Sequence, residues 1–459
     1  MVRNLGYALL SASTVLASNH LAPRNESVSP YFGAIKDYLD TLKEDVWPIN
    51  QEIHDNPELG YEEVRAHELL TTFMESQDGW EVTRSVKNIS TAFTAVFTGN
   101  GDGPIIGFNS EYGMHLLCAS FKKACADQTT IDALPGLGHG CGHNLIASVG
   151  MSAALATAEI MRQESLPGKV VLFGTPAEES LGGKIKMLEA GIFSDQKIDI
   201  SLMAHPSTSN TPYFNSFATD RFEVEYYGKE AHASASPWEG INAEDALVLA
   251  YNALSMLRQQ TTKTDQIHGI ITSAGSRINV IPSLSQASFQ IRSKDSSTLE
   301  KWTDRVMQCF EAGSIGTGAE LNVTIRPYGY ANMVTNDVLA ESYAKWFTGL
   351  GGELPDLALA KIEDPAGSSD QGDVSHEFPS IHPMFAITTA NGSVPDGGTH
   401  TAAFEVAAGS RAAFELAIRA ANGLAGVAVD VLTTDGMLDK IKEDFEGQER
   451  RRRKRSLRL

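Results

Sequence analysis

The chain is poor in cysteine, and this scarcity excludes one class of fold. Its four cysteines are spaced irregularly over 459 residues. Secreted folds that are held together by disulfides have far more cysteine in much shorter chains, so we expect no disulfide scaffold. The composition is 42 % hydrophobic, which is enough to bury a substantial core, and the length favours two domains.

Positive charge is also scarce. The chain has 37 Lys and Arg against 57 Asp and Glu, which gives a formal net charge of -20. Nucleic acids and anionic membrane surfaces are bound by clustered Lys and Arg, so we expect neither as a partner. The one basic cluster, at residues 450–455, favours a solvated tail, with a targeting tag as the alternative.

Long apolar runs are missing as well. A bilayer-spanning helix needs roughly 18 or more apolar residues, and no stretch of the sequence approaches this length, so we expect no membrane span. The N-terminal residues 1–20 are a weak signal-peptide candidate, because polar residues interrupt their apolar run. We therefore expect a cytoplasmic protein, with secretion as the alternative.

Hydrophobic patterning divides the chain into two kinds of structure. Before residue 216 and after residue 330, short apolar runs alternate with helical patterns, which predicts an α/β domain with a largely parallel central sheet flanked by helices. Between these parts, strands with a two-residue period indicate a smaller α+β domain whose sheet is open on one face. The predicted divisions are an extension (1–30), a discontinuous catalytic domain (31–215 and 331–440), an inserted domain (216–330) and a basic disordered tail (441–459).

Side chains that bind metals stand at four places where strands or loops end. Taken singly, each has an ordinary explanation, such as a buried thiol, acids at a helix N-terminus or a structural histidine. Together, one thiol, three imidazoles and two carboxylates predict a metal site. These side chains belong to Cys141, His143, Glu178, Glu179, His205 and His400.

The adjacent carboxylates Glu178 and Glu179 point to a division of roles. Neighbouring carboxylates at the end of an apolar strand repel one another unless a cation compensates. If a metal does so, one carboxylate can act as its ligand and the other can take a proton from bound water.

The order of motifs along the chain resembles the aminoacylase/dipeptidase metallohydrolases. Within them it is most similar to the amidohydrolase branch that includes β-alanyl-lysine dipeptidase, p-aminobenzoyl-glutamate hydrolase, hippurate hydrolase and auxin-amide hydrolases. The resemblance runs from about Tyr31 to about Val431. Its motifs are HDNPELGYEE (54–63), GHGCGHN (138–144), EE (178–179), GKEAHA (228–233), NVIP (279–282) and GTH (398–400).

The resemblance implies a two-metal hydrolase. It implies that Glu178 is the general base for attack by metal-activated water on the amide bond of a small N-acyl amino acid or a dipeptide. It also implies two divalent ions, zinc or manganese, and a homodimer. The implied metal ligands are Cys141, His143, Glu179, His205 and His400.

For the inserted domain, the resemblance implies a lid and a dimerisation surface. His232 is then the histidine that contacts the carbonyl oxygen of the scissile amide, across a dimer or upon closure. Asn279 is an expected substrate contact. Arg292 is a candidate for holding the substrate carboxylate, and a salt-bridged surface arginine is the alternative.

One segment departs from the family pattern. Residues 113–131 separate Glu111-Tyr112 from Asp132-Ala-Leu-Pro-Gly, which are contiguous in the branch that the chain resembles. One hypothesis is a retained intron, because excision restores the motif without a gap; the other is a genuine specificity loop. Asp132 is expected to orient a metal-bound histidine, and the insertion places that role in doubt.

Two rival functions remain open. The same metals would serve an enzyme that trims an amide-linked intermediate in a biosynthetic pathway. A non-catalytic homologue used for binding or regulation is less favoured, because the full ligand set and Glu178 are retained.

Overall fold

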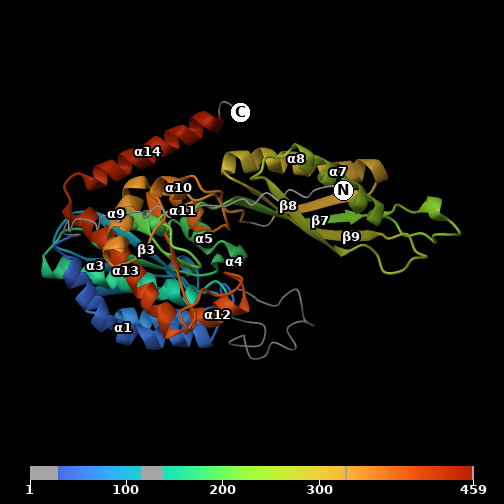
Figure 1. Cartoon of the computed structure of the whole chain (residues 1–459). Helices are drawn as coiled ribbons and strands as arrows, with labels where there is room; N and C mark the ends of the chain where they lie inside the picture. The colour runs from blue at the N-terminus through green and yellow to red at the C-terminus, as the bar shows by residue number, and fades with distance from the viewer. Residues whose placement is uncertain (1–28, 115–137, 326–327, 457–459) are drawn as a thin grey trace, which may run out of the picture.

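The computed structural model describes residues 29–114, 138–325 and 328–456. Most of the predicted extension (1–30), Asp132 and nearly all of the 113–131 segment lie outside the described residues. Figure 1 shows two parts side by side, a larger one with a helix-covered sheet and a smaller one that contains helices α7 and α8.

The larger part is built on a six-stranded sheet with strand order β1-β2-β4-β3-β5-β11. The four strands from β4 to β11 are parallel, and β1 and β2 add an antiparallel edge. The prediction of a largely parallel sheet is confirmed for the half that contains the site. The strands are β1 (Trp80–Arg84), β2 (Phe93–Thr98), β3 (Ile105–Glu111), β4 (Lys169–Thr175), β5 (Ile200–Leu202) and β11 (Ser380–Ile381).

Helix α3 (His143–Gln163) forms the centre of this part and is buried along almost its whole length. It packs on β3 and β4, and helices α1 (Phe32–Asp55) and α13 (Arg411–Thr433) pack against it. Gly150 permits the close approach, because a Cβ there would lie 2.6 Å from the carbonyl oxygen of Asn109 in β3. The start of α3 is thereby fixed at the carboxyl edge of the sheet.

Two of the described helices, α3 and α13, are long and apolar enough to cross a membrane by length and composition alone. In α3, 94 % of the apolar window is buried inside the protein, and in α13 the share is 72 %. Core helices of this kind meet the same criterion, so the two helices are weak evidence for a span.

The smaller part has a four-stranded antiparallel sheet with strand order β10-β7-β9-β8. Helices α7 (Ala243–Leu257) and α8 (Ser296–Thr317) cover one face, where Phe222, Phe289 and Phe310 are buried. Burial alternates along β9 with a period of two, so the opposite face carries the polar side chains. The strands are β7 (Ala218–Tyr227), β8 (Gln266–Ser273), β9 (Leu284–Ser293) and β10 (Glu320–Ile325).

The remaining elements are short segments around the sheets and helices at the surface. They are α2 (Val64–Glu75), η1 (Val86–Asn88), α4 (Glu178–Leu181), α5 (Gly183–Glu189), α6 (Ile192–Gln196), β6 (His205–Ser207), η3 (Pro237–Glu239), η4 (Arg258–Gln260), α9 (Asp337–Gly349), α10 (Leu357–Lys361), α11 (Gln371–Glu377), β12 (Met384–Ala386) and α12 (Ala402–Ala408).

The C-terminal segment corrects one prediction. Residues 441–456 belong to helix α14 (Met437–Ser456), so the prediction of a disordered basic tail is wrong for this range. Ile441 is fully buried in the main core, and the Lys442 ammonium lies 2.6 Å from a carboxylate oxygen of Asp199. These anchors at the first turns hold the helix on the protein, which the charge of the later residues concealed.

Candidate metal centre and cleft

The metal-binding side chains that the sequence predicts converge at the carboxyl edge of the six-stranded sheet. Glu178 and Glu179 begin α4 directly after β4, and His205 begins β6 just after β5. Cys141 and His143 flank Gly142, whose φ is +79° and whose Cβ would lie 2.6 Å from Pro206. Glycine therefore lets the Cys-x-His turn lie against the segment that carries His205.

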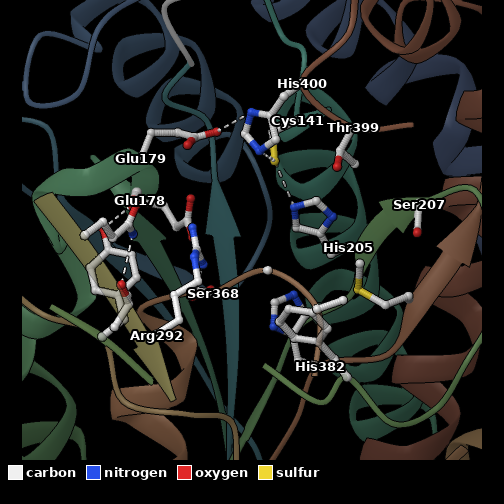
Figure 2. A pocket seen from close by; sticks show the side chains of 18 of the residues that line it. Cys141, Glu178, Glu179, His205, Ser207, Arg292, Ser368, His382, Thr399 and His400 are labelled. Carbon is white, nitrogen blue, oxygen red and sulfur yellow. Dashed lines mark hydrogen bonds and ion pairs between the residues drawn. The ribbon is translucent and has the colours of Figure 1, made fainter. Parts of the chain in front are cut away.

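Interatomic distances place these groups around common points. The Cys141 sulfur lies 3.3 Å from Nε2 of His205 and 3.6 Å from Nε2 of His400. An oxygen of Glu179 lies 3.9 Å from Nδ1 of His400. Ligand atoms that share one tetrahedral zinc ion lie roughly 3–4 Å apart, so these separations suit coordination. Figure 2 shows the side chains facing one another.

The donors form two triplets that share the thiol. Their ligand atoms lie within 4.8 Å of one another in Cys141, His143 and His205, and likewise in Cys141, Glu179 and His400. Two adjacent ions with a common sulfur would fit this arrangement. All five sequence-predicted ligands are therefore brought together, with Glu178 beside them.

A third triplet contains a residue that the sequence prediction missed. Glu111, at the end of β3, joins His143 and Glu178 within the same distance limit. The available signal was its position, because it ends an apolar strand next to β4, as Glu178 follows one.

The charge state of the buried donors fits a site for divalent cations. Burial, and then the charges of Glu111 and Glu179, raise the pKa of Glu178 far above its ordinary value. Burial raises the pKa of Glu179 to about 8 and that of the Cys141 thiol well above its usual range. Burial lowers the pKa of His143 to about 4. Such groups lack compensation by themselves, and a cation supplies it.

Unpartnered atoms point the same way. Among the described residues, one oxygen each of Glu111 and Glu179 and Nε2 of His143 are buried without a hydrogen-bond partner. Buried polar atoms without partners are rare and costly, and metal coordination would satisfy all three. The residues present therefore fit a metal centre.

A cleft of about 610 Å³ adjoins these side chains. It is bordered by Glu178, His205 and His400 on one side and by Arg221 and Arg292 of the smaller sheet on the other. Arg292 donates a hydrogen bond to the Ser368 hydroxyl at 2.8 Å and has no carboxylate partner among the described residues. It is thus a cleft residue, and the alternative of a salt-bridged surface arginine does not describe it.

His382 also lines the cleft and was missed by the sequence prediction. Its side chain is buried, and within the described ranges neither ring nitrogen has a hydrogen-bond partner. The ring lies 5.7 Å from that of His205 and 4.9 Å from that of Phe214, measured between centroids. A lone histidine before a proline gives no sequence signal for such a position.

His232 and Asn279 do not line the cleft of their own chain. They lie together on the exposed part of the smaller domain, where the Ala233 amide donates to the Asn279 carbonyl at 3.1 Å. Nδ1 of His232 accepts from the Ser234 and Ala235 amides, so the proton of the neutral ring is on Nε2. The ring is ready to donate, and its role across a dimer or upon closure remains a prediction.

Comparison with known proteins identifies the family. A family model described as a peptidase dimerisation domain matches residues 217–316. The Xaa-Arg dipeptidase of Mus musculus is 38 % identical over 413 residues, which cover 89 % of this chain and 90 % of that protein. The chain belongs to the M20 metallopeptidase family.

Other M20-type relatives agree. One of the p-aminobenzoyl-glutamate hydrolase polypeptides of Escherichia coli is 32 % identical over 287 residues, or 62 % of this chain and 58 % of that protein. A solved structure of a dinuclear metal-binding M20 peptidase from Bacillus subtilis has the same fold, with a TM-score of 0.64, 18 % identity and coverage of 86 % of this chain and 99 % of that one. The predictions of fold class, hydrolase activity and metal-dependent amide hydrolysis are confirmed for this M20 protein.

Proposed function

We propose that this M20 enzyme hydrolyses the peptide bond of a dipeptide, or the amide bond of a small N-acyl amino acid, with two divalent ions, zinc or manganese, at Cys141. The observation that carries the proposal is the pair of donor triplets that share the Cys141 thiol at the wall of the cleft. Dipeptides with a C-terminal arginine are the first substrates to test, because the 38 % identical mouse relative is a Xaa-Arg dipeptidase.

Each cleft residue has a proposed task. When bound, the two ions acidify water and polarise the scissile carbonyl. Glu178 takes the proton of the attacking water and delivers it to the leaving nitrogen, since its carboxylate lies at the cleft beside His143. His232, from the lid, donates a hydrogen bond to the carbonyl oxygen as charge develops there.

Arg292 is proposed to hold the substrate carboxylate. Its guanidinium faces the cleft from β9, and Ser368 fixes its orientation. Burial, and then the neighbouring charge of Arg221, lower the pKa of Arg292, which identifies a second cation close by. Two guanidinium groups favour an anionic substrate end at this side of the cleft.

The proposed enzyme is a homodimer. The match of residues 217–316 to a peptidase dimerisation domain supports this state. The polar face of the smaller sheet carries Arg221 and Arg292, so dimer formation and substrate binding would use the same small domain.

The direct test is an assay with a panel of dipeptides and N-acyl amino acids. We expect hydrolysis that stops with a chelator and returns with zinc or manganese. The Arg292→Ala variant should raise KM by roughly tenfold or more for substrates with a free carboxylate and much less for their C-terminal amides. Arg305→Ala, on α8 and outside the cleft, is the matched control. Well-folded, metal-loaded protein that hydrolyses none of the panel would overturn the proposal.

A further inference from the structure

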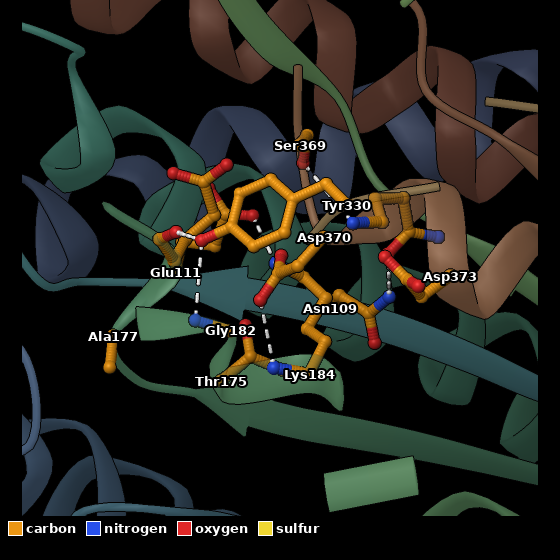
Figure 3. Close-up of polar contacts among 12 residues, drawn as sticks. Asn109, Glu111, Thr175, Ala177, Gly182, Lys184, Tyr330, Ser369, Asp370 and Asp373 are labelled. Carbon is orange, nitrogen blue, oxygen red and sulfur yellow. Dashed lines mark hydrogen bonds and ion pairs between the residues drawn. The ribbon is translucent and has the colours of Figure 1, made fainter. Parts of the chain in front are cut away.

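Three charged side chains form a buried cluster behind the metal centre. Lys184 of α5 contacts Glu111 and lies 2.5 Å from an oxygen of Asp370, and all three side chains are at most 1 % exposed. The Lys184 amide also donates to the second Asp370 oxygen at 2.8 Å. Figure 3 shows Lys184 between the two carboxylates. The lysine is thus fixed from two sides, and it fixes one oxygen of Glu111.

The second oxygen of Glu111 faces the metal-binding side chains. It has no hydrogen-bond partner among the described residues, and it lies 3.5 Å from Nε2 of His143, which has none either. Glu111 stands at the end of β3, and Lys184 holds its other oxygen, so this direction is set by the fold rather than by a free side chain.

Hydrogen-bond accounting makes this pair of atoms unusual. Nδ1 of His143 lies 2.5 Å from the Gly113 carbonyl oxygen, which can only accept. The ring proton is therefore on Nδ1, and Nε2 of the neutral ring presents a lone pair. The facing Glu111 oxygen is also an acceptor. Two buried acceptors that face each other without a proton between them repel, and a shared cation removes the repulsion.

Charge balance leads to the same point. Lys184 supplies one positive charge for two carboxylates, and Glu178 and Glu179 add two more acids within the same buried region. A separation of 3.5 Å also suits two ligand atoms of one ion with bonds of about 2.0–2.1 Å.

We propose that Glu111, oriented by Lys184, is a sixth protein ligand of the metal centre and binds, through its free oxygen, the ion that His143 also holds. The inference rests on the proposed function and deepens it, because it adds a ligand and a negative charge to that site. Lys184 and Asp370 are positioning residues, which set the direction of the Glu111 carboxylate without contacting the ion.

The test compares metal binding by the full-length protein and its Glu111→Gln variant. Metal-free samples are titrated with zinc against a chromophoric chelator, and bound ions are counted by elemental analysis. We expect two ions in the unmodified protein, and in the variant a second ion bound roughly 10–100-fold more weakly. Glu405→Gln is the matched control, because Glu405 is 2 % exposed and pairs with His54 away from the centre.

The outcomes separate this inference from the proposed function. Unchanged affinity for both ions in folded Glu111→Gln protein overturns the role of Glu111 and leaves the proposed function standing. An unmodified protein that binds no ion overturns both. Should Glu111→Gln fail to fold, Glu111→Asp serves instead: it keeps a charge opposite Lys184, but its shorter side chain cannot also reach the ion. Weaker binding of the second ion is then expected, and unchanged binding again overturns the inference.

Discussion

Nδ1 of His143 lies 2.5 Å from the carbonyl oxygen of Gly113. A main-chain carbonyl thus fixes the tautomer of this histidine and directs its other nitrogen into the metal centre. The family resemblance assigns such an orienting role to the carboxylate of Asp132, which lies outside the described residues. For His143, the required hydrogen bond comes from the first residue of the inserted segment.

A chain that lacks residues 113–131 should retain its metal centre. Asp132 would then follow Tyr112, and its main-chain carbonyl would take the place of the Gly113 carbonyl. A Cβ at this position lies 2.7 Å from a side-chain oxygen of Glu63, so the Glu63 carboxylate must turn aside. We expect the same number of bound ions and equal or faster hydrolysis, measured by elemental analysis and steady-state kinetics. Loss of bound metal on deletion would identify the segment as a genuine part of the site, as would its presence in a correctly spliced, abundant transcript.

Replacing Glu178 by glutamine should remove catalysis and spare the metals. The amide cannot take the proton of the attacking water, and general-base catalysis contributes roughly 10²–10⁴-fold to turnover. We expect kcat to fall by this factor while elemental analysis still finds the ions. Glu164→Gln, at the C-terminal end of α3, is a control for general effects of the substitution. Near-normal kcat would remove Glu178 from its assigned role.

Mixed dimers can show whether His232 serves its own chain or its partner. His232→Ala and Glu178→Ala should each lose roughly 10²-fold or more in kcat. If His232 reaches across the dimer, the heterodimer of the two variants has one intact site. An equal mixture then recovers roughly a quarter of the normal activity, because half of its dimers are mixed. No recovery in verified heterodimers would favour closure within one chain.

The stability of the protein should fall in alkaline solution through His54. Burial alone would lower the pKa of His54, but hydrogen bonds to Glu405 and Asp55 outweigh it and raise this pKa to about 9. Because the folded-state pKa exceeds the unfolded value of about 6.5, the stabilisation is complete below pH 6.5 and is lost as the pH rises through 9. We expect the free energy of unfolding to drop by about 2 kcal/mol over this window, relative to His54→Gln.

Urea unfolding at pH 6 and pH 9.5, at one fixed metal concentration, measures this difference. His268→Gln, on the exposed strand β8, should follow the unmodified protein at both values. If His54→Gln also loses stability to the same extent as the unmodified protein, the decline comes from other groups and the prediction fails.

The ligand set could be predicted because each donor carries its own local signal. Cys141 and His143 stand among glycines, Glu178 and Glu179 follow a buried strand, and His205 follows another. Apolar strands in an α/β pattern end at one edge of the sheet, so their trailing polar residues are brought together by any fold of this class. Chemistry and strand position were sufficient, without knowledge of the strand order.

Glu111 and His382 escaped prediction for a physical reason. Glu111 ends a strand like the other donors, but its role depends on which of its oxygens Lys184 occupies, and Lys184 follows it by 73 residues. His382 shows its unpartnered nitrogens only when β5 and β11 pair and place it beside His205. Neither relationship has a local pattern in the chain.

The amino-acid sequence by itself determined the class of fold, the metal-binding side chains and the hydrolytic chemistry, because periodicity and side-chain type are local properties. Only the tertiary structure decided the antiparallel edge of the sheet, the docking of α14, the cleft position of Arg292 and the direction of Glu111. Those features depend on which distant segments pack together, and the packing free energy is a sum over many weak contacts that no short stretch of sequence contains.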